Sequence, residues 1–160
     1  MFSLSTRGLE SVQTNAETLG MNPGFIHLHL HTEYSLVDGI VRIKPLISMA
    51  KALNMPALAI TDQSNFYALV KFYQACLGAG IKPILGSDLW LHNESDRAKP
   101  SRVLVLCKNN EGYLNLKKLI SLSYLEGQYL GKAIIQKDWL VNHRQGLIVL
   151  IGKESDVGQL

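Results

Sequence analysis

The feature that most constrains the fold is an alternation of short apolar segments with longer amphipathic ones, which begins at residue 25. The short segments have the length and composition of β-strands, and the longer ones repeat apolar residues with the period of an α-helix. We expect strands at residues 25–31, 57–61, 81–91, 102–107 and 146–151. We expect helices at residues 43–53, 65–77 and 111–124, with a short helix at 137–142. This alternation predicts an α/β fold built on a parallel sheet.

Individual residues indicate where the predicted helices begin and end. Pro45 suits the first turn of the helix at 43–53, where its missing N–H costs little. Ser64 is expected to cap the helix at 65–77, and the glycine-rich residues 78–80 are expected to end it. The helix at 43–53 should bury one apolar face, formed by Ile43, Leu46, Ile47, Ala50 and Leu53.

Both ends of the chain depart from the alternating pattern. Residues 1–24 show no strong periodicity and end in an Asn-Pro-Gly turn sequence, so we expect a leader that is poorly ordered or foreign to the natural protein. Nine residues, 152–160, follow the last predicted strand, which is too few for another helix and strand. A closed α/β barrel usually takes about 250 residues. We therefore expect residues 25–160 to be the N-terminal portion of a larger domain.

The composition excludes several classes of protein. With 47% hydrophobic and 18% charged residues, the chain is not intrinsically disordered. Its net charge is 16 − 13 = +3 and the basic residues are scattered, so charge alone does not indicate nucleic-acid binding. Cys76 and Cys107 have neither metal-binding nor disulfide spacing, which favours reduced thiols in a cytoplasmic protein. No apolar run reaches about 18 residues, so no membrane-spanning helix is expected.

The segment richest in chemistry holds three of the chain's five histidines, His27, His29 and His31, at alternate positions. Side chains alternate between the faces of a strand, so these three imidazoles would point the same way. Imidazoles two residues apart stand about 7 Å apart at the backbone and can converge on one metal ion or on neighbouring ions. Asp38, in the loop that follows, could add a carboxylate oxygen. The simpler alternative is a strand whose histidines are satisfied by hydrogen bonds alone.

Two further acidic residues, Asp62 and Asp88, lie at predicted strand ends. In parallel α/β folds, functional groups gather at the carboxyl ends of the strands. On that basis one rim of the sheet should carry His31, Asp38, Asp62 and Asp88. For Asp62 a turn or helix-capping role within residues 61–65 remains an equal alternative.

Motifs of other catalytic classes are missing. Ser87 follows a glycine but lacks the second glycine of a nucleophile elbow. Lys132 follows Gly131, but no glycine stands five positions before Gly131, so there is no phosphate-binding P-loop. The glycines at 78 and 80 follow a predicted helix instead of a strand, which excludes a dinucleotide-binding fingerprint.

Four segments, taken in order, resemble a known family. The sequence HLHTEYSLVDG at residues 29–39 resembles the opening motif of the polymerase and histidinol phosphatase (PHP) superfamily, and AITD at 59–62 resembles its second motif. The segments GAGIKPILG at 78–86 and NNEGYLNL at 109–116 are more particular. They resemble the alpha subunits of bacterial DNA polymerase III. The resemblance extends from about residue 25 to residue 151.

This resemblance implies an irregular seven-stranded (β/α) barrel, incomplete in this chain, at the start of a long polymerase. Family members with intact sites bind up to three metal ions, which would be Zn²⁺, Mn²⁺ or Mg²⁺, and can hydrolyse phosphodiesters. Some of them act as 3'–5' proofreading exonucleases. In other members the site has decayed and the domain is a scaffold, which in some polymerases holds a separate proofreading subunit.

Compared with the family's metal ligands, the chain keeps His29, His31 and Asp38. It departs at three positions. Gln63 stands where the family has a histidine after the second motif, and Asp88 stands where a glutamate is expected. Arg102 replaces a histidine at the start of the fourth strand, and a guanidinium cannot ligate a metal. Because a phosphodiester-cleaving cluster needs its metals, we expect a degenerate site with weak metal binding at most and no catalytic residue in this chain. His27 and Asp62 would be accessory residues.

The resemblance therefore implies a scaffold domain of a replicative DNA polymerase, inactive by itself. DNA synthesis would use Mg²⁺ in a domain outside this chain. The implied partners are the rest of the polymerase chain, a proofreading exonuclease subunit and a sliding clamp, with DNA contacted mainly by the full-length protein and no membrane involved. The alternative is a metal-dependent phosphoesterase or 3'–5' exonuclease of the same superfamily. A DNA-binding module is a third reading, which the dispersed charge supports little.

Overall fold

The computed structural model describes residues 24–36 and 38–152, so the predicted leader and tail lie almost entirely outside the described residues. The chain divides into two compact units. Unit 1 comprises the described residues up to Ile60 together with Tyr67–Ile84. Unit 2 comprises Thr61–Phe66 and the described residues from Leu85 onward. In the part of the chain that the structure describes, no helix has the length and hydropathy needed to cross a membrane.

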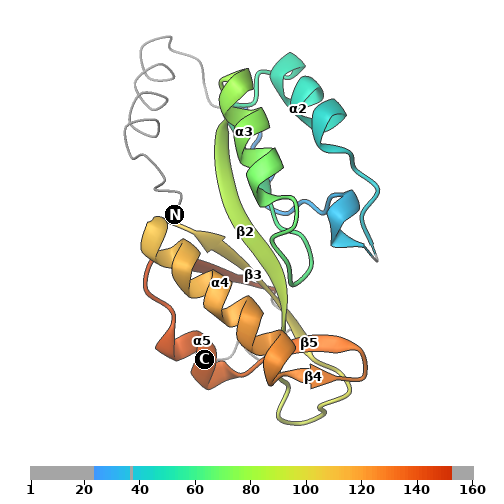
Figure 1. The fold of residues 1–160 in the computed structure, drawn as a ribbon, viewed down its shortest axis with the longest axis vertical. Coiled ribbons are helices and arrows are strands. Elements are labelled where there is room, and N and C mark those ends of the chain that lie inside the picture. Colours follow the sequence, from blue (N-terminus) through green and yellow to red (C-terminus); the bar gives the residue numbers. More distant parts are fainter. Residues whose placement is uncertain (1–23, 37, 153–160) are drawn as a thin grey trace. The chain divides into compact units, whose positions relative to one another are not determined.

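Unit 1 is built from two helices and short extended segments. Its elements are the 3₁₀ turn η1 (Glu33–Ser35), α2 (Ile43–Ala52), β1 (Ala57–Ile60), α3 (Leu69–Ala79) and the first residues of β2 (Lys82–Leu91). Helices α2 and α3 pack against each other, and Figure 1 shows them side by side. The largest side chains buried in this unit include Ile43, Leu58 and Phe72. Leu58 has no exposed surface, as expected for a strand covered on both faces.

The helix predictions for unit 1 are confirmed in part. Helix α2 ends one residue before the predicted end, and Leu53, expected on its apolar face, is 58% exposed. Helix α3 ends at Gly80, which has the left-handed φ of 75° that glycine adopts readily. Its predicted start at residue 65 is wrong, because the helix begins at Leu69 and its N-cap is Ala68, not Ser64. The Ser64 N–H donates to the Asp88 carbonyl instead, at 2.8 Å, with φ of 51°.

The predicted strand at residues 25–31 is also wrong. A backbone hydrogen bond of 3.0 Å from the Ala59 N–H to the His27 carbonyl links this segment to β1, but the segment has no regular strand geometry. Thr32 forms an isolated bridge with Val41 and then caps η1. The chain therefore turns back at the point where a regular strand would have continued.

Unit 2 is a helix packed on a sheet. Its elements are the rest of β2, β3 (Ser101–Cys107), α4 (Asn110–Leu125), β4 (Gln128–Tyr129), β5 (Lys132–Ile135), α5 (Lys137–Asn142) and β6 (Leu147–Ile151). The strand order is β4-β5-β2-β3-β6, and β1 pairs with β2 outside this path. Figure 1 shows α4 lying across the strands. The core between helix and sheet contains Leu89, Leu91, Val103, Val105, Leu116, Leu119, Ile120 and Ile135.

The α/β class is confirmed, but the sheet is mixed. Strand β2 runs parallel to β5 and antiparallel to β3, and β3 runs antiparallel to β6. Antiparallel neighbours need no crossover helix, and residues 92–100, which join β2 to β3, contain none. The β4–β5 hairpin was not predicted, because strands of two and four residues are too short to show periodicity. The predictions for the last helix and strand are confirmed by α5 and β6.

Alternation along β2 and β3 divides their side chains between two faces. Leu89 and Leu91 point into the core beneath α4, so Asp88 and Trp90 lie on the opposite face. Asp88 pairs with Leu104 and Trp90 pairs with Arg102 across the two strands. Arg102 is therefore the diagonal neighbour of Asp88 on the face away from α4.

Residues 109–116 form the N-cap and the first turns of α4. The Asn109 side chain caps the helix by accepting from the Gly112 N–H at 2.9 Å, and the Lys108 N–H donates to the Gly146 carbonyl at 2.8 Å. A Cβ atom on Gly112 would collide with the Gly146 carbonyl. The helix thus begins against the backbone that leads into β6, at a distance that only glycine permits.

Candidate metal centre

The turn after His31 determines where Asp38 lies. Thr32 is fully buried, and its Oγ1 accepts a hydrogen bond from the Tyr34 N–H at 3.2 Å. The Glu33 N–H donates to the Val41 carbonyl at 2.9 Å, which closes the turn. A Cβ atom on Gly39 would collide with the Thr32 carbonyl, so the tight return of the chain requires glycine there.

Asp38 contacts one imidazole of the predicted site. Its Oδ1 lies 3.0 Å from Nδ1 of His31 and accepts a hydrogen bond of 2.6 Å from the Ser35 hydroxyl. A carboxylate beside Nδ1 favours the proton on that nitrogen, which leaves Nε2 of His31 available as a metal ligand. Asp38 is thus placed to orient His31, in the carboxylate–histidine arrangement that supports many metal sites.

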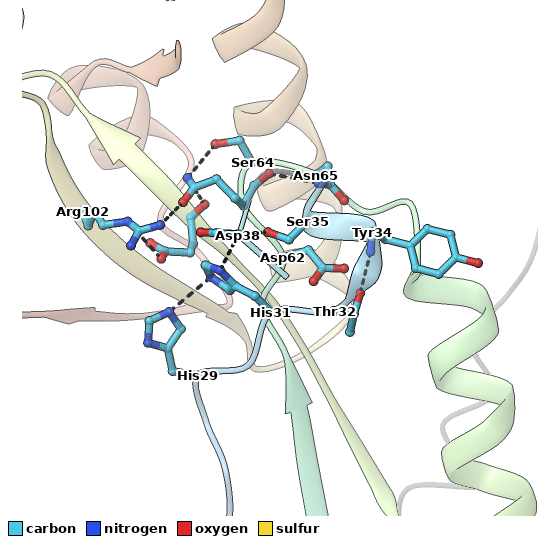
Figure 2. A network of polar contacts seen from close by, with 12 residues as sticks. His29, His31, Thr32, Tyr34, Ser35, Asp38, Asp62, Ser64, Asn65 and Arg102 are labelled. Carbon is cyan, nitrogen blue, oxygen red and sulfur yellow. Dashed lines mark hydrogen bonds and ion pairs between the residues drawn. The ribbon is translucent and has the colours of Figure 1, made fainter. Parts of the chain in front are cut away.

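The two histidine side chains converge. Nε2 of His29 lies 3.3 Å from Nε2 of His31, and the ring centroids are 5.0 Å apart in an edge-to-face arrangement. Figure 2 shows this contact and the neighbouring one to Asp38. Zinc–imidazole bonds of about 2.0–2.1 Å in tetrahedral geometry place two ligand nitrogens roughly 3.3–3.4 Å apart. The observed separation therefore suits two ligands of one tetrahedral ion.

His27, the third histidine of the segment, has a different neighbour. Its ring packs edge-on against Phe25 with the centroids 4.7 Å apart, and both residues are exposed. The expectation that three imidazoles share one strand face depended on a regular strand, which the structure does not have.

In unit 2, a second cluster surrounds Asp88, whose side chain is only 3% exposed. Nε of Arg102 lies 3.4 Å from the Asp88 carboxylate, and Nη2 of Arg102 donates to the Gln63 amide oxygen at 2.5 Å. The Gln63 amide nitrogen in turn donates to the Asp88 backbone carbonyl at 2.9 Å. These contacts join Asp88, Gln63 and Arg102 in a closed ring, which we call the Arg102 ring.

Asp62 lies in a segment tied to β2 by backbone contacts. The buried Ser87 hydroxyl donates to the Asp62 carbonyl at 2.7 Å, and the Asp88 N–H lies 3.3 Å from the same oxygen. Asp62 is 2% exposed. The Asp62 backbone therefore helps to fix the position of Asp88.

The Arg102 ring joins residues that lie far apart in the sequence. Gln63 and Arg102 are 39 positions apart, yet they contact each other directly. Arg102 supplies a permanent positive charge beside a buried carboxylate, the electrostatic role that a bound cation would otherwise have. Their mutual contact depends on the pairing of β2 with β3 and on the bridge between Gln63 and Asp88.

The two cysteines are poor candidates for metal binding. Burial raises the pKa of the Cys76 thiol to about 12 and that of Cys107 to about 12. Metal ligation and nucleophilic chemistry both use the thiolate. At neutral pH both side chains therefore stay protonated.

Comparison with known proteins identifies relatives along most of the chain. The PHP domain family matches residues 27–160. The chain is 50% identical over 139 residues to the DNA polymerase III subunit alpha of Pseudomonas fluorescens, covering 86% of this chain and 12% of that protein. It is 46% identical over 138 residues to the Escherichia coli K12 protein of the same name, with the same coverage. The chain therefore spans about an eighth of the length of these relatives.

A solved structure also shows some likeness. An amidohydrolase from Chromobacterium violaceum is 22% identical, with a TM-score of 0.45, over 59% of this chain and 32% of that one. A likeness of this extent supports no conclusion about the site.

Proposed function

Because this chain belongs to the PHP domain family, we propose that it is the N-terminal domain of a bacterial replicative DNA polymerase and that it acts as a scaffold. DNA-templated synthesis would be the activity of the parent protein, whose much longer relatives are DNA polymerase III alpha subunits. This domain would contribute structure and docking surface, and would not polymerise or hydrolyse DNA by itself.

The observation that carries the proposal is the Arg102 ring. A metal-dependent phosphodiesterase needs cations that generate hydroxide and bind the scissile phosphate. The ring directs a guanidinium at the buried Asp88 carboxylate and engages the Gln63 amide oxygen, so a metal at Asp88 would have to displace an ion pair. Arg102 stabilises the Asp88 carboxylate without a metal ion, as expected for a domain that acts as a scaffold and not as a nuclease.

A single metal ion remains compatible with the site. His29 and His31 would supply nitrogen ligands, and Asp38 would orient His31. By its position in the sequence motif, Asp88 is the third residue that we assign to such a site. Imidazole ligands favour Zn²⁺ over Mg²⁺, with Mn²⁺ intermediate, because Mg²⁺ prefers oxygen. Such an ion would add a Lewis acid, but the proposed role of the domain does not require it.

The remaining assignments follow from the proposed parent. The rest of the polymerase chain would be the first partner of the domain, and a proofreading exonuclease subunit and a sliding clamp would bind the assembled enzyme. All of these would act in the cytoplasm.

The alternative, a metal-dependent phosphoesterase or 3'–5' exonuclease, draws its support from the two converging histidines. A nuclease assay separates the two functions. The full-length parent protein should release no nucleotides from a 3'-labelled primer with Mn²⁺ or Zn²⁺ beyond the level of its His29→Ala/His31→Ala variant. Release that EDTA abolishes and that this variant lacks would establish the exonuclease and reject the scaffold.

A further inference from the structure

The β4–β5 hairpin ends in a turn whose first residue is an exposed leucine. Tyr129 pairs with Lys132, so Leu130 and Gly131 form a two-residue loop. Their φ values are 46° and 75°, and positive φ at both loop positions is typical of a type I′ turn. Asparagine, aspartate and glycine dominate these turns, because other residues tolerate positive φ poorly. Leu130 is therefore a poor choice for its own backbone, and its side chain is 73% exposed.

Leu36, another leucine with positive φ, differs from Leu130 in its surroundings. The chain on either side of Leu36 is closed by the hydrogen bond from the Glu33 N–H to the Val41 carbonyl, so a longer turn fixes its backbone. A two-residue loop makes no comparable demand, and asparagine would suit it better than leucine. A residue that breaks a local preference without a structural reason marks a candidate functional position.

The base of the hairpin is fixed against the end of α4. The Ile134 N–H donates to the Gly127 carbonyl at 3.1 Å, and a Cβ atom on Gly127 would collide with the Ile134 carbonyl. Ala133 and Ile135, on either side of Ile134, are buried. Because the base is fixed, the turn presents Leu130 in a defined position, which lowers the entropy lost when its side chain is bound.

The apolar surface at this end of unit 2 is small. Besides Leu130, the exposed large apolar side chains within residues 124–130 are Tyr124 and Leu125, at the end of α4, which contacts β4. A stable interface between separate proteins buries about 800 Å² on each partner, and three side chains supply only a fraction of that area. A contact within one polypeptide can be smaller, because the tether raises the effective concentration. This chain spans about an eighth of the length of its relatives, so the proposed parent has ample chain for such a contact.

The charges beside the turn indicate the chemistry of the surface that would meet it. The guanidinium carbon of Arg97 lies 4.3 Å from the Tyr129 ring centroid, and Lys132 is the cross-strand partner of Tyr129. Within the described part of the chain, no carboxylate lies within ion-pair distance of Arg97 or Lys132. Glu126, at the C-cap of α4, is the acidic residue of this stretch. A complementary surface would therefore offer an apolar pocket to Leu130 and carboxylates to the two cations.

We propose that Leu130 inserts into an apolar pocket on a segment of the parent polymerase outside this chain, with carboxylates of that segment facing Arg97 and Lys132. The proposal rests on the proposed function, because it requires the longer parent. It assigns the β4–β5 hairpin as a docking surface of the scaffold, separate from the histidine pair and from the Arg102 ring.

A Leu130→Asn variant of the full-length parent separates docking from turn preference. Asparagine suits the turn, so a Leu130 that touches nothing predicts unchanged amide exchange everywhere outside the hairpin. Docking predicts that one segment outside residues 1–160 exchanges about 10–100-fold faster in the variant, the factor for full burial of one leucine side chain. Hydrogen–deuterium exchange mass spectrometry measures this change, which should not depend on protein concentration. The Arg97→Gln/Lys132→Gln variant should speed exchange of the same segment by less than about tenfold.

The matched control is Leu53→Asn, which replaces an exposed leucine with an ordinary φ of −86° at the end of α2. This control should leave exchange outside residues 1–160 unchanged. No change in the Leu130→Asn variant, an equal change in the control, or an affected segment without acidic residues would overturn the docking. A change that disappears on dilution would indicate contact between separate chains and overturn it as well. Primer extension by the wild-type protein tests the proposed function independently, so its absence would reject that function together with the docking, whereas extension without any change in exchange would reject the docking alone.

Discussion

Replacement of Arg102 by leucine should destabilise the domain, because it removes the guanidinium that lies 3.4 Å from the buried Asp88 carboxylate. Loss of one partner from a fully buried ion pair costs about 3–5 kcal/mol. The Asp88 side chain is 3% exposed but that of Arg102 is 44% exposed, so solvent screens part of the interaction. We therefore expect the free energy of unfolding to fall by roughly 1–3 kcal/mol. For a chain of this size, a loss near 2 kcal/mol lowers Tm by about 4–8 °C.

Thermal unfolding followed by circular dichroism measures this loss, and two further variants identify its cause. With Asp88→Asn already present, the Arg102→Leu substitution should cost less than about 1 kcal/mol, because no buried charge remains to be neutralised. Arg42→Leu is the control. Arg42 lies 3.8 Å from Glu33 in an exposed pair, and its loss should change stability by at most about 0.5 kcal/mol. An Arg102→Leu effect as small as that of Arg42→Leu, or one undiminished beside Asp88→Asn, would refute the reasoning.

Three further predictions concern other contacts. Gly112→Ala should cost at least about 2 kcal/mol in urea unfolding, since the new methyl group would collide with the Gly146 carbonyl, and a loss below about 0.5 kcal/mol would contradict the close packing. Asp38→Ala should weaken zinc binding about 10–100-fold in calorimetry by releasing the histidine that Asp38 orients, whereas an unchanged affinity would deny it that role. Cys76, which is buried and has its pKa raised to about 12, should stay a thiol below that pH and resist a disulfide reagent at pH 8 until the chain unfolds; rapid labelling of Cys76 in the folded chain would contradict its burial.

Periodicity predicted the long elements of this fold and failed where tertiary contacts decide the structure. Helix α4 and strands β2 and β3 have apolar patterns long enough to specify their type. The segment at residues 25–31 has a strand-like composition, but the buried turn at Thr32 diverts the chain. Strands β2 and β3 run antiparallel, and the loop between them at residues 92–100 contains no crossover helix. Local residue propensities do not predict the relative direction of two strands.

The candidate site was predictable as a set of residues but not as a set of contacts. The spacing of His29, His31 and Asp38 indicated a metal site, and the structure adds the contact between the Asp38 carboxylate and Nδ1 of His31. Gln63 and Arg102 read as separate losses in the sequence, whereas the structure joins them. Contacts between residues 39 positions apart depend on strand register, which the sequence pattern of a single strand does not specify.

We propose that the Arg102 ring takes the place of most of the metal ions that a PHP site would otherwise bind. Titration calorimetry of the EDTA-stripped 160-residue chain with Zn²⁺ tests this claim most directly, beside the His29→Ala/His31→Ala variant. The account predicts no more than one zinc ion per chain, with binding lost in the variant. Two or more tightly bound ions per chain, or binding that survives loss of both histidines, would contradict it.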